Sequence, residues 1–162
     1  MVDVTVKVEG LANTERKLRM LPVRIGRNAM RRALRRGANT IRDAARSNFV
    51  ALDDGPTPEK IFKNVVVQGA SARRNRQEGG VVMRVGVLGG SRNMTAYGEF
   101  KGAGKGNPGG DTWYWRLLEF GTSRFAAKAP MRKAMATAAE KAMTTTAAAM
   151  DTEIDKELAK LG

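Results

Sequence analysis

Side chains that commonly perform catalysis or bind metals are scarce in this sequence. Its 162 residues contain no cysteine and no histidine. This excludes thiolate and imidazole metal ligands, cysteine nucleophiles and a Ser-His-Asp triad. One acidic pair, Asp53 and Asp54, stands beside Gly55, and we interpret it as part of a turn. Four acids near the C-terminus are interpreted as the solvated face of a helix: Asp151, Glu153, Asp155 and Glu157.

One glycine-rich stretch matches a nucleotide-binding motif by its letters. Residues 104–109 read Gly-Lys-Gly-Asn-Pro-Gly, which fits G-x-G-x-x-G. No apolar strand precedes this stretch, although the motif requires one. We interpret it as part of a loop and predict no cofactor and no enzymatic activity. Phosphoryl transfer through Lys105 is the remaining enzymatic alternative.

Positive charge is the strongest signal in the composition. Lysine and arginine number 29 against 16 aspartates and glutamates, a net charge of +13. Such an excess indicates a polyanionic partner, and the planar arginine fork suits phosphate or carboxylate groups. The candidate contacts are Arg24, Arg27, Arg31, Arg32, Arg35, Arg36, Arg42 and Arg46, followed by Arg73, Arg74 and Arg76. The residues alone do not decide between DNA and an acidic protein surface.

Hydrophobic periodicity indicates which elements position these arginines. Residues 1–10 alternate valine with polar residues, which predicts a strand. Residues 11–50 form a basic helical region, in which Pro22 starts a second helix with one apolar stripe. Residues 130–161 have a helical apolar pattern and predict a C-terminal helix.

The middle of the chain, residues 60–120, predicts a sheet with two long loops. Residues 61–67 and 81–88 are valine-rich and predict a hairpin, and part of residues 112–120 predicts a further strand. The loops are residues 68–80 and 89–110. Together the elements predict a single domain over residues 1–162, of the α+β class: an antiparallel sheet of about four strands with two long helices packed on one face.

A turn of unusual composition precedes the C-terminal helix. An aromatic segment, interpreted as a strand or a short helix, runs into Glu119-Phe120-Gly121-Thr122, and Gly121 suits a positive φ. Pro130 suits the first turn of a helix. The glutamate either pairs with an arginine or accepts backbone N–H bonds. The candidate corner and interface residues are Trp113, Trp115, Glu119, Phe120, Gly121, Thr122 and Pro130, and the two tryptophans suit core packing or a subunit contact better than base stacking.

The Glu119-Phe120-Gly121-Thr122 turn, followed within about ten residues by the helix that Pro130 begins, resembles the neck or tail-completion family of long-tailed bacteriophages. The basic N-terminal helix is a second similarity. Met131 and Lys133 are departures, because members often carry an aromatic residue and a second proline at these positions.

The resemblance implies a structural virion protein without catalytic activity, located in the neck and assembled in the host cytoplasm. It implies a homo-oligomeric ring of six or twelve copies that joins the head connector to the tail around the DNA channel. The implied partners are head connector or head-completion proteins, tail-terminator or tail-tube proteins, and DNA in the channel, with no membrane. The residues alone also allow a different class of protein, a stand-alone basic nucleic-acid-binding protein.

Overall fold

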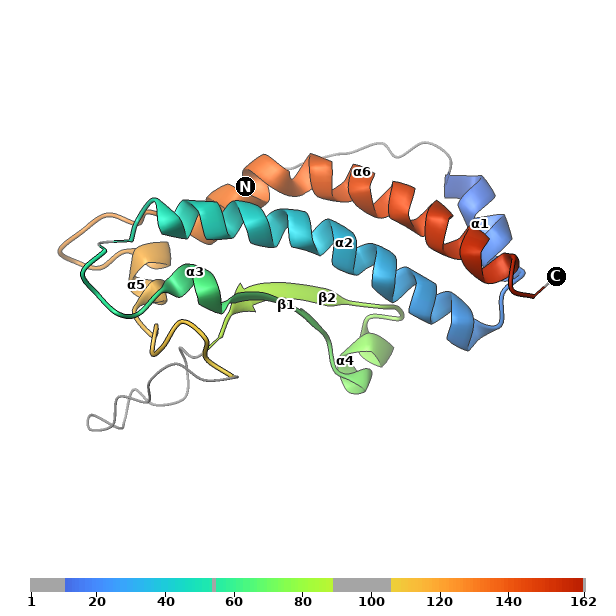
Figure 1. Cartoon of the computed structure of the whole chain (residues 1–162), viewed down its shortest axis with the longest axis horizontal. Helices are drawn as coiled ribbons and strands as arrows, with labels where there is room; N and C mark the ends of the chain where they lie inside the picture. Colours follow the sequence, from blue (N-terminus) through green and yellow to red (C-terminus); the bar gives the residue numbers. More distant parts are fainter. Residues whose placement is uncertain (1–10, 54, 89–105, 162) are drawn as a thin grey trace. The chain divides into compact units, whose positions relative to one another are not determined.

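The computed structural model describes residues 11–53, 55–88 and 106–161, and it is mostly helical (Figure 1). The predicted strand in residues 1–10 lies outside the described residues. In chain order the elements are α1 (Leu11–Arg19), α2 (Val23–Val50), α3 (Ile61–Asn64), β1 (Val65–Gly69), α4 (Ala72–Gln77), β2 (Met83–Val87), α5 (Trp115–Phe120) and α6 (Pro130–Leu158).

The chain divides into two compact units, and each long helix contributes to both. Unit 1 comprises Met1–Thr40, Val67–Arg84 and Ala138–Gly162. Unit 2 comprises Ile41–Val66 and Val85–Thr137.

Small residues on α2 and α6 let the two helices approach closely in unit 1. Ala29 and Ala33 have no exposed surface. A Cβ added to Gly37 would lie 2.5 Å from the carbonyl oxygen of Ala142 and closer still to the Thr146 hydroxyl. Larger apolar side chains complete the core where α1 joins it; they are Leu18, Leu21, Ile25, Met150, Ile154 and Leu158.

A second core lies in unit 2, together with one buried asparagine. The core consists of Ala45, Phe49, Ile61, Val65 and Ala134. The amide nitrogen of Asn64 donates to the carbonyl oxygen of Gly110 and to the Thr112 hydroxyl, and its side-chain oxygen accepts from the backbone N–H of Gly109. These bonds fix the segment that leads into α5.

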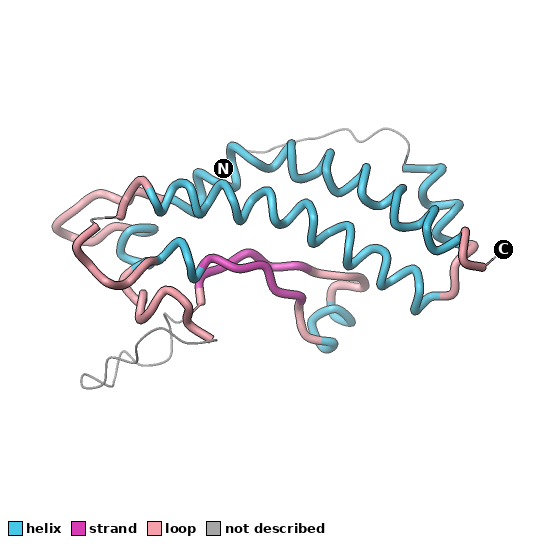
Figure 2. The backbone as a smooth tube through the Cα atoms, in the orientation of Figure 1, coloured by secondary structure: helices cyan, strands magenta, loops and turns pink. Residues whose placement is uncertain are grey.

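The predicted sheet of about four strands is wrong, because the described residues form a sheet of only two strands, β1 and β2 (Figure 2). These strands are antiparallel. The Ala70 N–H donates to the carbonyl oxygen of Val82 and the Leu88 N–H to that of Asn64, so residue numbers increase along one strand as they decrease along its partner. Two long helices on one face of a larger sheet are therefore excluded for the described part of the chain.

Two segments that were expected to be strands form short helices, because their buried side chains are spaced at a helical period. Residues 61–64 form the short helix α3, because the buried Ile61 and Asn64 share a face only at a helical period. Residues 115–120 form α5, in which Trp115 and Leu118 pack on the core of unit 2 and Glu119 is buried. Aromatic content alone suggested a strand there, and packing overrode that preference.

The expected loop 68–80 also contains regular structure. Residues 68 and 69 finish β1, and α4 follows after Ser71. The Ser71 hydroxyl accepts the backbone N–H of Arg74, which is the contact that starts a helix.

Candidate functional site

Glu119 ties α5 to the first turn of α6, and this contact defines the corner. Its side chain is only 3% exposed. The carboxylate accepts the backbone N–H groups of Met131 and Arg132 at 2.8 and 3.1 Å, and the Arg132 Nε at 3.0 Å. The first N–H groups of a helix have no intrahelical partner, and the helix dipole favours a negative charge beside them. Both roles expected for Glu119 are therefore confirmed.

The loop between the two helices is closed by short-range backbone contacts. Gly121 has φ of 75°, as expected, and a Cβ there would lie 2.7 Å from the nitrogen of Ala127. The Thr122 hydroxyl accepts the backbone N–H groups of Arg124 and Phe125. Pro130 begins α6, as predicted. The corner is thus held from Glu119 to the start of α6 by bonds within unit 2.

Large apolar side chains remain exposed around this corner. Phe120 is 68% exposed, and the Arg132 guanidinium lies 5.6 Å from its ring centre, within cation–π distance. The others in this part of unit 2 are Trp113, Leu117, Phe125 and Met135. In contrast, Trp115 is half-buried against the core of unit 2. Exposed apolar residues that gather in one region commonly mark a protein contact.

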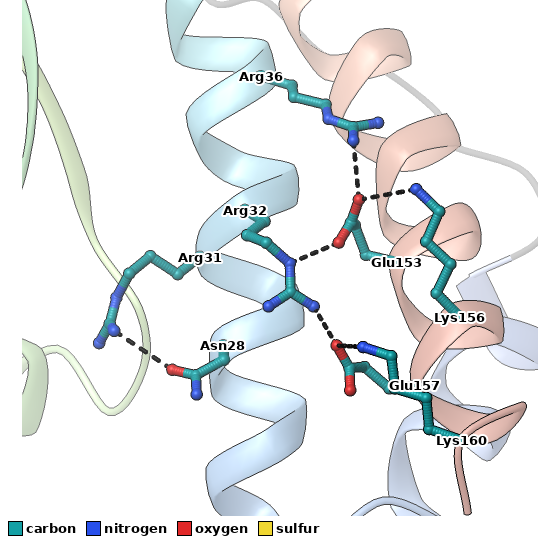
Figure 3. A network of polar contacts seen from close by, with 8 residues as sticks. All are labelled: Asn28, Arg31, Arg32, Arg36, Glu153, Lys156, Glu157 and Lys160. Carbon is teal, nitrogen blue, oxygen red and sulfur yellow. Dashed lines mark hydrogen bonds and ion pairs between the residues drawn. The ribbon is translucent and has the colours of Figure 1, made fainter.

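The arginines predicted to contact a partner divide into those that form ion pairs within the chain and those that form none with a described residue. Figure 3 shows the paired side, where Arg32 bonds both Glu153 and Glu157 and Arg36 bonds Glu153 at 2.8 Å. Glu153 is buried, so the predicted solvated acidic face is wrong for this residue. Two further acids of that face have partners in α1: Asp155 pairs with Lys17 and Asp151 accepts from Thr14.

These contacts change the acidity of the two glutamates. The Arg32 guanidinium, hydrogen-bonded to Glu153, holds the pKa of that carboxyl below its ordinary value despite burial. Lys160 and then Arg32 lower the pKa of Glu157 in the same direction. The C-terminal part of α6 therefore supplies an anionic neighbour that relieves the repulsion between successive arginines of α2.

Other predicted contact residues also have partners within the chain. Arg42 pairs with Asp43, Arg74 pairs with Glu78, and Arg46 donates to the carbonyl oxygen of Val65. Among the described residues, Arg31 donates to the amide oxygen of Asn28 and forms no ion pair. No ion pair within the described residues involves the remaining candidates, which are Arg24, Arg27, Arg35, Arg73 and Arg76.

Three of the arginines line one cavity in unit 1. Arg27 and Arg31 of α2 and Arg76 of α4 surround a space of about 430 Å³. The other lining residues are small or neutral: Ala70, Ala72, Asn75, Gly79, Gly80 and Val81. No carboxylate of the described residues lines it.

The other candidate motifs provide no assembled site. Asp53 pairs with Lys60 at 2.9 Å, and Asp54, Gly104 and Lys105 lie outside the described residues. Within the described ranges, no three potential metal ligands gather into a group. None of the helices there is both long and apolar enough to span a bilayer.

The roles of two important residues, Asn64 and Glu153, were not predicted from the sequence. Asn64 organises the segment before α5, and the available signal was a single amide inside an apolar run. Glu153 bonds two arginines from the far end of the chain, and no local pattern marks such a distant pairing.

Comparisons of the chain with protein-family models, with curated proteins and with solved structures returned no significant match. The relation to the phage neck family therefore stays a proposal.

Proposed function

We propose that this protein is a structural component of the bacteriophage neck, a tail-completion protein that forms a homo-oligomeric ring between the head connector and the tail. The observation that carries the proposal is the corner, where a buried glutamate fixes the start of α6 and large apolar side chains stay exposed. A fixed corner with an apolar surface is suited to contact with a second copy of the chain.

A ring would also give the arginines a purpose. Closed symmetry repeats each surface around an axis, so the unpaired cations of every copy would face the same channel or the same neighbouring ring. Repeated weak contacts then add through multivalency, and each subunit need bind only modestly.

The proposal is tested by changing the corner surface without changing the corner itself. Leu117 and Phe125 are exposed, and neither carries the Glu119 contacts through its side chain. We expect Leu117→Asp/Phe125→Asp to fold but to form neither rings nor joined head–tail particles, as counted by negative-stain electron microscopy. A matched control is Met20→Asp/Val23→Asp, which places the same charges on two exposed apolar positions of unit 1.

Two outcomes would contradict this function. One is a corner variant that assembles as well as the control. The other is a wild-type chain that is absent from phage particles and never associates with connector or tail proteins.

A stand-alone nucleic-acid-binding protein is the second candidate, and the unpaired arginines favour it. It predicts tight binding of the isolated monomer to duplex DNA, with an affinity that falls steeply as salt rises. The two candidates differ in assembly: a monomer that binds tightly and joins no particle supports the second.

A further inference from the structure

The cavity lined by Arg27, Arg31 and Arg76, here named the arginine pocket, has the composition of an anion site. Arg27, Arg31 and Arg76 line one space of about 430 Å³, and none of them forms an ion pair with a described residue. Like charges that line one space repel one another, so an anion there would be stabilised by these arginines.

Among the described residues, acidic side chains form ion pairs with Arg32 and Arg36 of α2 but with none of the three arginines of the pocket. Figure 3 shows Arg32 and Arg36 reaching toward α6, whereas Arg31 reaches the opposite way. Glu153 and Glu157, which bond the first set, do not line the pocket. The three arginines of the pocket are therefore separated from Glu153 and Glu157, the acidic partners that the chain supplies to Arg32 and Arg36.

The wall opposite α2 is held by Asn75. Its amide nitrogen donates to the carbonyl oxygen of Ala70, and its side-chain oxygen accepts the backbone N–H of Val82. Gly79 and Gly80 bring no side chain into the pocket, and their N–H groups are used within the turn. Recognition of a ligand in the pocket therefore falls to the three arginines.

The pattern of arginines along α2 suits an anion of high linear charge density. Arg24, Arg27, Arg31 and Arg35 recur at steps of three and four residues, which places them on one face. They extend along about 17 Å of helix. Duplex DNA presents one phosphate charge per about 1.7 Å of its axis, so a row of arginines of this length can face several phosphates.

We propose that the arginine pocket binds a backbone phosphate of duplex DNA, independently of base sequence. No aromatic ring from the described part of the chain lines the pocket, so those residues offer no platform on which a base could stack. One guanidinium group can bind two oxygens of a phosphate at once, and contacts to phosphates carry no direct information on base sequence. The inference rests on the proposed function for the setting, a channel that holds DNA.

The test measures DNA binding by the full-length chain as a function of salt, using fluorescence anisotropy of two short duplexes of unrelated sequence. The test variant is Arg27→Gln/Arg31→Gln/Arg76→Gln. The control, Arg124→Gln/Lys128→Gln/Lys141→Gln, removes three charges from exposed positions outside the pocket and so has the same net charge.

We expect the test variant to lose about tenfold or more in affinity, as for loss of one charge-assisted contact. Its slope of log affinity against log salt should shrink by about 1, because one phosphate is no longer neutralised. The control should keep most of the affinity and the slope, and both duplexes should behave alike. A third variant, Arg27→Lys/Arg31→Lys/Arg76→Lys, should keep the slope and lose part of the affinity, because it keeps charge without the planar fork.

Equal losses in the test and control variants would overturn the pocket in favour of diffuse charge. If polyglutamate binds the wild type as tightly as DNA does, and the test variant loses affinity for both equally, the pocket's partner would be an acidic protein instead. Circular dichroism and melting temperature verify that the variants fold. The assembly test of the corner is independent: failure there, with DNA binding as expected, refutes the neck function and leaves the pocket standing.

Discussion

Glu119 shows how one buried charge can define a corner. Its carboxylate is surrounded by three donors, two of them backbone N–H groups at the positive end of α6. Replacing the carboxylate by an amide of the same size leaves all three donors without an anionic acceptor, and at least one of them then faces the amide NH2 group. The contact is local in sequence, since it spans from residue 119 to residue 132, which is why the composition of the turn could suggest it.

We expect Glu119→Gln to lower the free energy of unfolding by about 1 to 2 kcal/mol, in the range of a lost cap and charge-assisted hydrogen bonds. Thermal or denaturant unfolding measures the change. Glu140→Gln removes the same charge from an exposed position of α6 and should be close to neutral. Equal stability of the two variants would mean that Glu119 contributes no more than a surface acid.

Gly121 has two separate reasons to be glycine, a positive φ and a close approach to the loop backbone. We expect Gly121→Val to destabilise the protein by about 1 to 3 kcal/mol for the backbone strain, with the clash against Ala127 adding to it. Gly79→Val is the control, because Gly79 has φ of 66° and nothing within 4 Å of an added Cβ. The difference in melting temperature between the two variants isolates the clash, and a Gly121 variant that melts with the wild type would contradict both reasons.

At the scale of elements, α2 and α6 are joined in unit 1 by ion pairs as well as by packing. Arg32 and Arg36 lie one turn apart on α2 and share Glu153 of α6. The pKa values of Glu153 and Glu157 are lowered by these contacts. A carboxyl with a lowered pKa in the folded state stabilises the protein above its ordinary pKa, and this stabilisation is lost as pH falls through the lowered value.

We therefore expect the melting temperature to fall as pH decreases below the ordinary pKa of a glutamate, because the pKa of both carboxyls is lower in the folded protein. Glu153→Gln should be less stable at neutral pH and should lose less on acidification. Glu140→Gln should keep the full dependence of the wild type. Parallel pH profiles for wild type and Glu153→Gln would show that the network does not contribute to folding.

Packing between α2 and α6 depends on one glycine. An added methyl group at Gly37 would meet the backbone of Ala142, whereas at Gly26 its nearest neighbour would be the flexible end of the Leu18 side chain, at 3.1 Å. Alanine in a helix is favoured over glycine by about 1 kcal/mol. We expect Gly26→Ala to be neutral or stabilising and Gly37→Ala to be destabilising, as measured by chemical denaturation. A stabilised Gly37→Ala would contradict the close approach of the two helices.

The two long helices and the hairpin of β1 and β2 were predictable, whereas the size of the sheet and the short helices were not. A long amphipathic stripe after Pro22 identifies α2, and a helical pattern that begins at Pro130 identifies α6, because a pattern that continues over many residues is a strong signal. Short segments such as α3 and α5 carry too few residues to separate a period of two from a helical one. Contacts between distant segments, as between Arg32 and Glu153, have no local signature, so the division of the arginines into paired and unpaired sets required the structure.

At the scale of the whole molecule, the net charge of +13 is a self-repulsion that the internal pairs only partly relieve. Arg24, Arg27 and Arg35 retain no ion pair within the described residues. Added salt weakens both repulsion and attraction, so its net effect reports which of them dominates.

We expect the melting temperature to rise as sodium chloride is added from low ionic strength to about 0.15 M, because screening relieves the surplus of like charges. The Arg27→Gln/Arg31→Gln/Arg76→Gln variant should respond less, since it has lost part of that surplus. A melting temperature that falls with salt would show that the ion pairs outweigh the repulsion.

The exposed loop between Gly121 and Pro130 offers a position for site-specific labelling of this chain. Residues 122–128 are exposed, and the protein has no native thiol. A Ser123→Cys substitution would therefore create a sole attachment point for a dye or spin label, a few residues from Glu119. The rate at which a maleimide reacts there, in the free chain and in a purified particle, would show directly whether another molecule covers that side.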